Sequence, residues 1–153
     1  MITYCVRKVK SWGEEGWAIC QVLGPATTDY VLITNDETRP KYGLFTDKKQ
    51  ADGMLSWLEH EQLERIKAYL EEELKTITAH VPQEDWASYP EYIALSSASH
   101  LLTTVKTPTA FAEALRAQKA RSEKTVSQGI NVEWRKEEAN YYQIMLDKLE
   151  ELS

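Results

Sequence analysis

One stretch of this sequence decides the fold, residues 46–78, which reads TDKKQADGMLSWLEHEQLERIKAYLEEELKTIT. Its apolar residues recur mostly at steps of three or four, which places them along one side of a helix. Thr46 is a suitable N-cap, because its hydroxyl can accept a hydrogen bond from a free backbone N–H of the first turn. Gly53 interrupts the pattern and either bends the helix or fits a close contact. The stretch predicts one long amphipathic helix with these inward residues: Ala51, Leu55, Leu58, Ile66, Leu70, Leu74 and Ile77.

The residues before this helix have the patterns of strands. Residues 2–9 alternate between apolar and polar, and a reversal with two glycines joins them to a second strand at 17–23. A third strand is expected at 30–34, and a short fourth strand at 42–45 leads into the Thr46 cap. The simplest arrangement is an antiparallel meander of three or four strands, with the long helix covering one apolar face.

The residues after this helix are predicted to be helical. A helix is expected at 91–105. Thr107 followed by Pro108 is a helix start signal, since the missing N–H of a proline costs nothing at the first helical position. That helix should run over 108–123, and a last helix should span 132–152.

Length and composition limit the class of protein. The chain has 153 residues, the usual size of one domain, with 27% charged and 42% hydrophobic residues, as in folded globular proteins. No apolar run approaches the roughly 18 residues of a membrane span, and the first ten residues lack the apolar core of a signal peptide, so a cytoplasmic location is expected. The expected fold is α+β in one domain over 1–153, with the sheet and long helix in 1–78 and a helical region in 79–153.

The net charge of −6 comes from the middle of the chain. Residues 51–100 hold three Lys and Arg against ten Asp and Glu, whereas the two flanking parts are nearly balanced. An acidic total argues against general nucleic-acid binding through phosphate contacts. The long helix carries a strip of acidic residues that either forms an ordinary solvated face or meets a basic protein partner. The strip consists of Glu61, Glu64, Glu71, Glu72 and Glu73.

Aromatic and apolar residues offer two further candidate contacts for a partner. Trp12 lies in a predicted turn. On the last helix Tyr142, Met145 and Leu149 follow the spacing of a helix–helix seam. That seam pairs either within the chain or between two copies, and we expect a homodimer.

Residues suited to catalysis are few and have no motif spacing. Cys5 and Cys20 lie on adjacent predicted strands, in a register that brings them nearly opposite one another, so they are either inert core fillers or a redox pair. His60, His80 and His100 lack the spacing of metal ligands. No nucleophile elbow, phosphate-binding loop or dinucleotide fingerprint occurs, so no catalytic residue, cofactor or metal site is assigned.

The stretch 116–136 is locally basic and carries the alternative function. Its cations could contact nucleic acid, although Glu113, Glu123 and Glu133 interrupt them. The candidate residues are Arg116, Lys119, Arg121 and Lys124, together with Arg135 and Lys136.

These observations favour a non-enzymatic protein-binding regulator or inhibitor that occupies a partner's surface. Small inhibitors of the kind carried by phages and mobile elements fit this size and acidity. A nucleic-acid-binding module is the alternative. A metal- or cysteine-dependent enzyme is a further alternative, which requires His or Cys residues distant in the sequence to converge.

Overall fold

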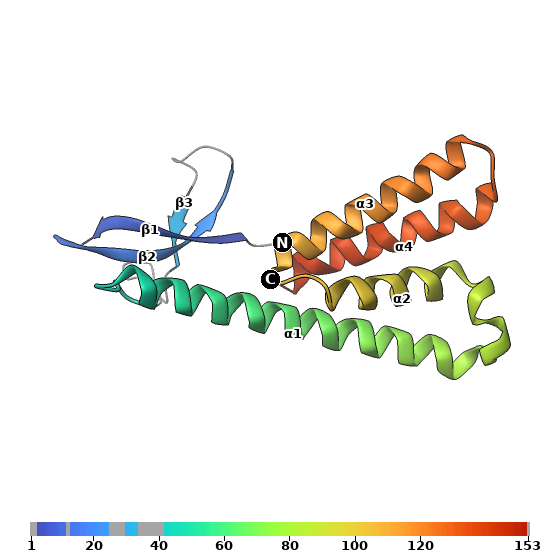
Figure 1. The fold of residues 1–153 in the computed structure, drawn as a ribbon, viewed down its shortest axis with the longest axis horizontal. Helices are drawn as coiled ribbons and strands as arrows, with labels where there is room; N and C mark the ends of the chain where they lie inside the picture. Colours follow the sequence, from blue (N-terminus) through green and yellow to red (C-terminus); the bar gives the residue numbers. More distant parts are fainter. Residues whose placement is uncertain (1–2, 12, 25–29, 34–41, 153) are drawn as a thin grey trace. The chain divides into compact units, whose positions relative to one another are not determined.

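The computed structural model describes residues 3–11, 13–24, 30–33 and 42–152. They form an α+β fold, in which a three-stranded antiparallel sheet is followed by a long helix and further helices, as the sequence predicts (Figure 1). The fold divides into two compact units, a sheet unit within residues 2–60 and a helical unit within residues 61–153.

The sheet unit is built on a β-hairpin. Strands β1 (Thr3–Ser11) and β2 (Glu14–Val22) pair antiparallel, and β3 (Tyr30–Leu32) pairs with the other side of β2, giving the order β1-β2-β3. In the hairpin turn Gly13 has φ +80°, a conformation that favours glycine.

The fourth strand expected at 42–45 is reduced to one bridge. Phe45 and Trp17 exchange two backbone hydrogen bonds of 2.8 Å, on the same side of β2 as β3. The approach is close, because a Cβ at Gly16 would lie 3.0 Å from the carbonyl oxygen of Phe45 and 3.1 Å from Cβ of Leu44. Gly16 therefore permits a contact that a side chain would obstruct.

The long helix α1 (Lys48–His80) begins at a cap one residue later than predicted. Oδ1 of Asp47, not the Thr46 hydroxyl, accepts a hydrogen bond of 3.0 Å from the backbone N–H of Lys49. The carboxylate is the stronger acceptor at a helix N-terminus. The helix continues through Gly53, where a Cβ would meet nothing within 4 Å, so close packing is not the reason for this glycine.

The helical unit contains the rest of α1 and three further helices. After the 3-10 helix η1 (Gln83–Ser88) come α2 (Pro90–Leu102), α3 (Pro108–Ser127) and α4 (Val132–Glu151). Successive helices run in opposite directions, α3 lies alongside α4, and α2 lies along α4 (Figure 1). None of the helices in the described ranges has the length and apolar character that crossing a membrane requires.

Local signals fix the ends of these helices. The Thr107 hydroxyl accepts a hydrogen bond of 3.1 Å from the N–H of Ala110, as the start signal predicts. Before α2 the indole N–H of Trp86 donates to the Val81 carbonyl at 2.9 Å, which holds η1 in place. Asn131 has φ 46° in the turn before α4, the left-handed region that asparagine tolerates better than most residues.

The core of the helical unit draws on all four helices. Tyr142 and Met145 are each 1% exposed and Leu149 is buried beside them, so the predicted seam of the last helix packs within the chain. A homodimer stays a prediction, and these three side chains are not surface residues through which it could form. The buried core consists of Ile66, Leu70, Ala94, Leu95, Ala98, Phe111, Ala112, Leu115, Tyr142, Met145 and Leu149.

Candidate functional site

Three carboxylates, carried by three helices, act on the hydroxyl of Tyr141. Tyr141 on α4 donates a hydrogen bond to Oε2 of Glu91 on α2, and the charges of Glu73 on α1 and Glu137 on α4 also act on it. Burial, the hydrogen bond to Glu91 and these negative charges raise the pKa of Tyr141 to about 12. Tyr141 thus experiences negative charge from carboxylates on α1, α2 and α4.

The same edge of α4 continues to a second tyrosine. Burial raises the pKa of Tyr69 on α1, and the charges of Glu73 and Glu151 add to the effect. Lys148 lies 5.8 Å from the Tyr69 ring centroid and 2.9 Å from Glu151, so Glu151 is paired. Between Tyr141 and Lys148 on α4, Ile144 is 44% exposed and adds an apolar surface.

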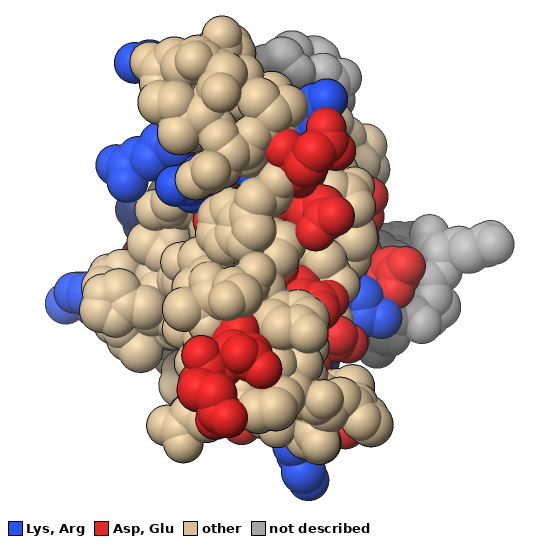
Figure 2. Space-filling model, turned by 90° about the vertical axis from the view of Figure 1, so that its right-hand side faces the viewer, with Lys and Arg blue, Asp and Glu red and all other residues tan. Residues whose placement is uncertain are grey.

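We call Glu73, Glu91, Glu137, Tyr141 and Ile144 the acidic cluster. Within the described residues no Lys or Arg forms an ion pair with any of its three carboxylates. Figure 2 views the end of the helical unit where α2 and α4 begin. Asp and Glu side chains form a band down this end, and Lys and Arg gather mainly at its upper left. The negative charge is therefore concentrated, not spread evenly.

The predicted acidic strip on α1 is less concentrated than the sequence suggests. Glu64, Glu71 and Glu72 are exposed as expected, whereas Glu61 is half-buried. Exposed basic residues are interleaved with them along the same helix, namely Arg65, Lys67 and Lys75. Glu73, the fifth residue of the strip, acts on Tyr69 and Tyr141 instead and belongs to the acidic cluster.

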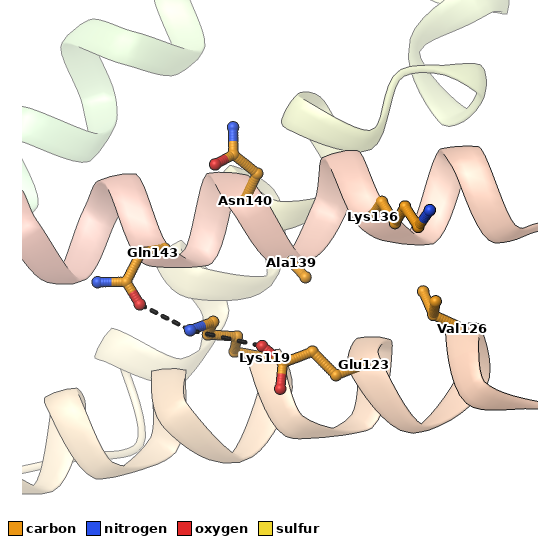
Figure 3. Close-up of a pocket in the computed structure, with 7 residues that line it drawn as sticks. All are labelled: Lys119, Glu123, Val126, Lys136, Ala139, Asn140 and Gln143. Carbon is orange, nitrogen blue, oxygen red and sulfur yellow. Dashed lines mark hydrogen bonds and ion pairs between the residues drawn. The ribbon is translucent and has the colours of Figure 1, made fainter.

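A groove runs between α3 and α4, with a hollow of about 360 Å³ (Figure 3). Lys119 crosses it, donating a hydrogen bond of 2.7 Å to Gln143 and lying 3.4 Å from Glu123. Gln143 in turn donates to Asp147 at 2.8 Å. Polar contacts within the chain therefore bridge the groove at the Gln143 end of the hollow (Figure 3).

The structure separates the predicted basic residues. Arg116 and Lys119 line the α3–α4 groove, whereas Arg121 and Lys124 are exposed elsewhere on α3. The second pair of candidates is engaged within α4. Arg135 donates to Glu138 at 2.8 Å, and Lys136 lies 4.0 Å from Glu133. Of these residues, Arg116, Lys119 and Lys136 line the groove, and Arg135 and Lys136 are paired with glutamates, so nucleic-acid binding stays a prediction without added support.

A buried carboxylate joins α3 to α4. Glu138 is 4% exposed and accepts hydrogen bonds from Arg135 and, at 2.5 Å, from the hydroxyl of Ser122. Nε of Arg135 is buried without a hydrogen-bond partner. Burial raises the pKa of neighbouring Tyr142, an effect that a hydrogen bond with Ser97 opposes and the charge of Glu138 adds to. Because Ser122 and Arg135 both bind Glu138, which is buried, this group stabilises the helical unit.

The cysteines and histidines form no catalytic grouping in the described structure. The register makes Cys5 and Cys20 direct partners across β1 and β2, as predicted, and both thiols are free. Burial raises the pKa of each thiol. The three histidines are exposed. Over the described ranges, no three His, Cys, Asp or Glu side chains could together hold a metal ion. Trp12, the predicted contact in the hairpin turn, lies outside the described residues.

Comparison of this chain with protein-family models, with curated proteins and with solved structures finds no match in any of the three. The acidic cluster therefore rests on the hydrogen bond of Tyr141 to Glu91 and on the charges that act on Tyr141. Sequence reasoning missed it, because Glu91 and Tyr141 are 50 positions apart. One signal was present, since Glu137, Tyr141 and Ile144 recur at steps of four and three on one edge of the last helix.

Proposed function

We propose that this protein is a non-enzymatic regulator or inhibitor that binds a basic segment of a protein partner at the acidic cluster. The observation that carries the proposal is the hydrogen bond from Tyr141 to Glu91, together with the charges of Glu73 and Glu137 that act on the same tyrosine, with no cation among the described residues paired to these carboxylates. Opposite charge at this position steers and orients a partner. The free cysteines and the lack of a disulfide framework support placing this regulator in the cytoplasm.

The surface also suggests the chemistry of the segment. Lys or Arg side chains would meet the carboxylates, and a cation can also stack on an aromatic ring such as Tyr141. Ile144 is exposed beside that ring and would receive an apolar side chain. The segment we expect therefore combines basic residues with at least one apolar residue, which distinguishes it from a simple polycation.

A charge-matched pair of variants tests the proposal. The probe is a fluorescent lysine-rich peptide that contains one leucine, and its affinity is measured by anisotropy at several salt concentrations. Glu73→Gln with Glu137→Gln removes two carboxylates from the cluster, whereas Glu71→Gln with Glu113→Gln removes two exposed carboxylates outside it. Both double variants have the same net charge, so nonspecific attraction falls equally in the two.

The cluster variant should bind about 5 to 30 times more weakly than the wild type, corresponding to about 1–2 kcal/mol for two ion pairs. The control variant should change affinity by less than about twofold. Equal weakening in the two variants, or no binding by the wild type, would show that the cluster is not a docking site.

A further inference from the structure

The outer edge of β1 is the longest unpaired strand edge in the described structure. The backbone N–H and C=O of Trp17 form hydrogen bonds with Phe45, and the carbonyl of Ile19 accepts a hydrogen bond from the N–H of Ile33. The backbone groups of odd-numbered residues of β2 are therefore directed away from β1. Even-numbered residues of β2 therefore bond to β1, where Ala18 is the partner of Arg7 and Cys20 the partner of Cys5.

This register determines which backbone N–H and C=O groups of β1 form no hydrogen bond with β2. Alternate residues of an antiparallel strand bond to opposite sides, so Val6, Lys8 and Lys10 direct N–H and C=O away from β2. In the part of the chain that the structure describes, no strand lies on that side and no backbone hydrogen bond uses these groups. An edge of this kind is a template for another strand.

The side chains of β1 restrict which strand can be added. Residues 3–11 include Arg7, Lys8 and Lys10 and no acidic residue. Lys8 and Lys10 are exposed, and together with Val6 they point to one face of the sheet, because side chains two apart share a face. A second copy of β1 paired antiparallel about Lys8 would place lysine against lysine, which is unfavourable.

We infer that the outer edge of β1 binds an extended acidic segment of a protein partner as an added antiparallel strand. The acidic side chains of the added segment lie opposite Lys10 and Lys8, so they are two positions apart in its sequence. Two positions further on, the segment places an apolar side chain opposite Val6. Backbone hydrogen bonds to the three outward residues supply affinity, and the alternating charges supply the register. This surface is separate from the acidic cluster, so either can fail without the other.

Two peptides of equal composition test this inference with the full chain. One contains the order glutamate, threonine, glutamate, threonine, valine within a threonine-rich strand; the other places the two glutamates next to each other. Neighbouring residues of a strand point to opposite faces, so the second peptide cannot set both glutamates against the lysines. The alternating peptide should bind about tenfold more tightly.

Amide hydrogen exchange shows where the strand binds. On addition of the alternating peptide the amides of Val6, Lys8 and Lys10 should become protected, while those of Arg7 and Val9, already bonded to β2, should change little. N-methylation of alternate peptide bonds on the bonding side of the peptide should abolish binding.

Charge variants complete the test. Lys8→Glu with Lys10→Glu should weaken binding at least about tenfold, whereas Lys67→Glu with Lys75→Glu, exposed on α1, should not. Four results overturn the inference: no preference for the alternating peptide, equal weakening by both variants, binding unchanged by N-methylation, or a β1-mediated dimer in place of peptide binding. The last would make the edge an interface between copies of this chain.

Discussion

The hydroxyl of Ser122 on α3 donates a hydrogen bond of 2.5 Å to Glu138 on α4, and both side chains are buried. Arg135 supplies the second contact to the same carboxylate oxygen. A buried carboxylate that loses its cation is costly, so Arg135→Gln should lower the free energy of unfolding by about 1–3 kcal/mol, at the lower end because Arg135 is partly exposed. Urea unfolding measures the loss.

Lys136→Gln is the matched control for that variant, since it removes the neighbouring cation from an exposed pair with Glu133. It should change the free energy of unfolding by less than about 0.5 kcal/mol. Similar losses of unfolding free energy in the two variants would mean that the burial of Glu138 does not require its contact with Arg135.

Tyr141 should ionise near pH 12, above the ordinary tyrosine pKa of 10.0. Since the folded chain holds this proton more tightly than the unfolded chain, its stabilising contribution is fully present below about pH 10 and is lost as the pH rises from about 10 to 12. The difference in phenolate absorbance between wild type and Tyr141→Phe follows the ionisation. Glu91→Gln should lower the pH at which Tyr141 ionises. An unchanged ionisation pH in this variant would contradict the role given to Glu91.

The cross-strand pair Cys5 and Cys20 should form a disulfide with glutathione disulfide. Direct antiparallel partners have Cα atoms about 5.5 Å apart in a hydrogen-bonded pair, within the range for disulfides. The Cys5 thiolate attacks the oxidant and releases one glutathione; the Cys20 thiolate then attacks the mixed disulfide and releases the second. Both protein thiols are oxidised as one glutathione disulfide is reduced.

Since burial raises the pKa of both thiols, the thiolate fraction is small at neutral pH and the reaction should accelerate as pH rises. Intact mass and free-thiol titration follow the product. Cys20→Ser should stop at a glutathione adduct on Cys5. A wild-type chain that also stops at an adduct would show that the two sulfur atoms cannot meet.

Two glycines should respond to alanine in opposite directions. Gly53→Ala should raise the free energy of unfolding by about 0.5–1 kcal/mol, because the position is exposed within α1 and a Cβ there meets nothing within 4 Å. Gly16→Ala should lower it, because the new Cβ would lie 3.0 Å from the Phe45 carbonyl oxygen. Thermal and urea unfolding report both, and destabilisation by Gly53→Ala would indicate a contact not seen in the structure.

Much of the fold was predictable because its signals are local. Alternation and a glycine turn gave the hairpin and brought Cys5 opposite Cys20, and the Thr107 cap with its following proline gave the start of α3. The cap of α1 was placed one residue early, since Thr46 and Asp47 are both good capping residues and the sequence does not rank them.

The candidate site was not predictable to the same degree, because it depends on contacts between distant helices. The acidic strip follows from the sequence of one helix, and Arg65 and Lys67 lie between its acidic residues. Which acidic residue contacts Tyr141 depends on how α1, α2 and α4 pack, and for the helix that carries Glu91 the sequence predicts only the range 91–105. The spacing of apolar and polar residues shows which face of a helix is buried, but it does not show which other helices lie against that face.

The boundary between the two compact units falls inside α1, between His60 and Glu61. A fragment starting at Glu61 would therefore begin in mid-helix, away from the Asp47 cap, with its first four backbone N–H groups lacking intrahelical acceptors. A fragment made for separate study should therefore start at residue 60 and carry a substitute cap there, for which His60→Ser is the simplest choice.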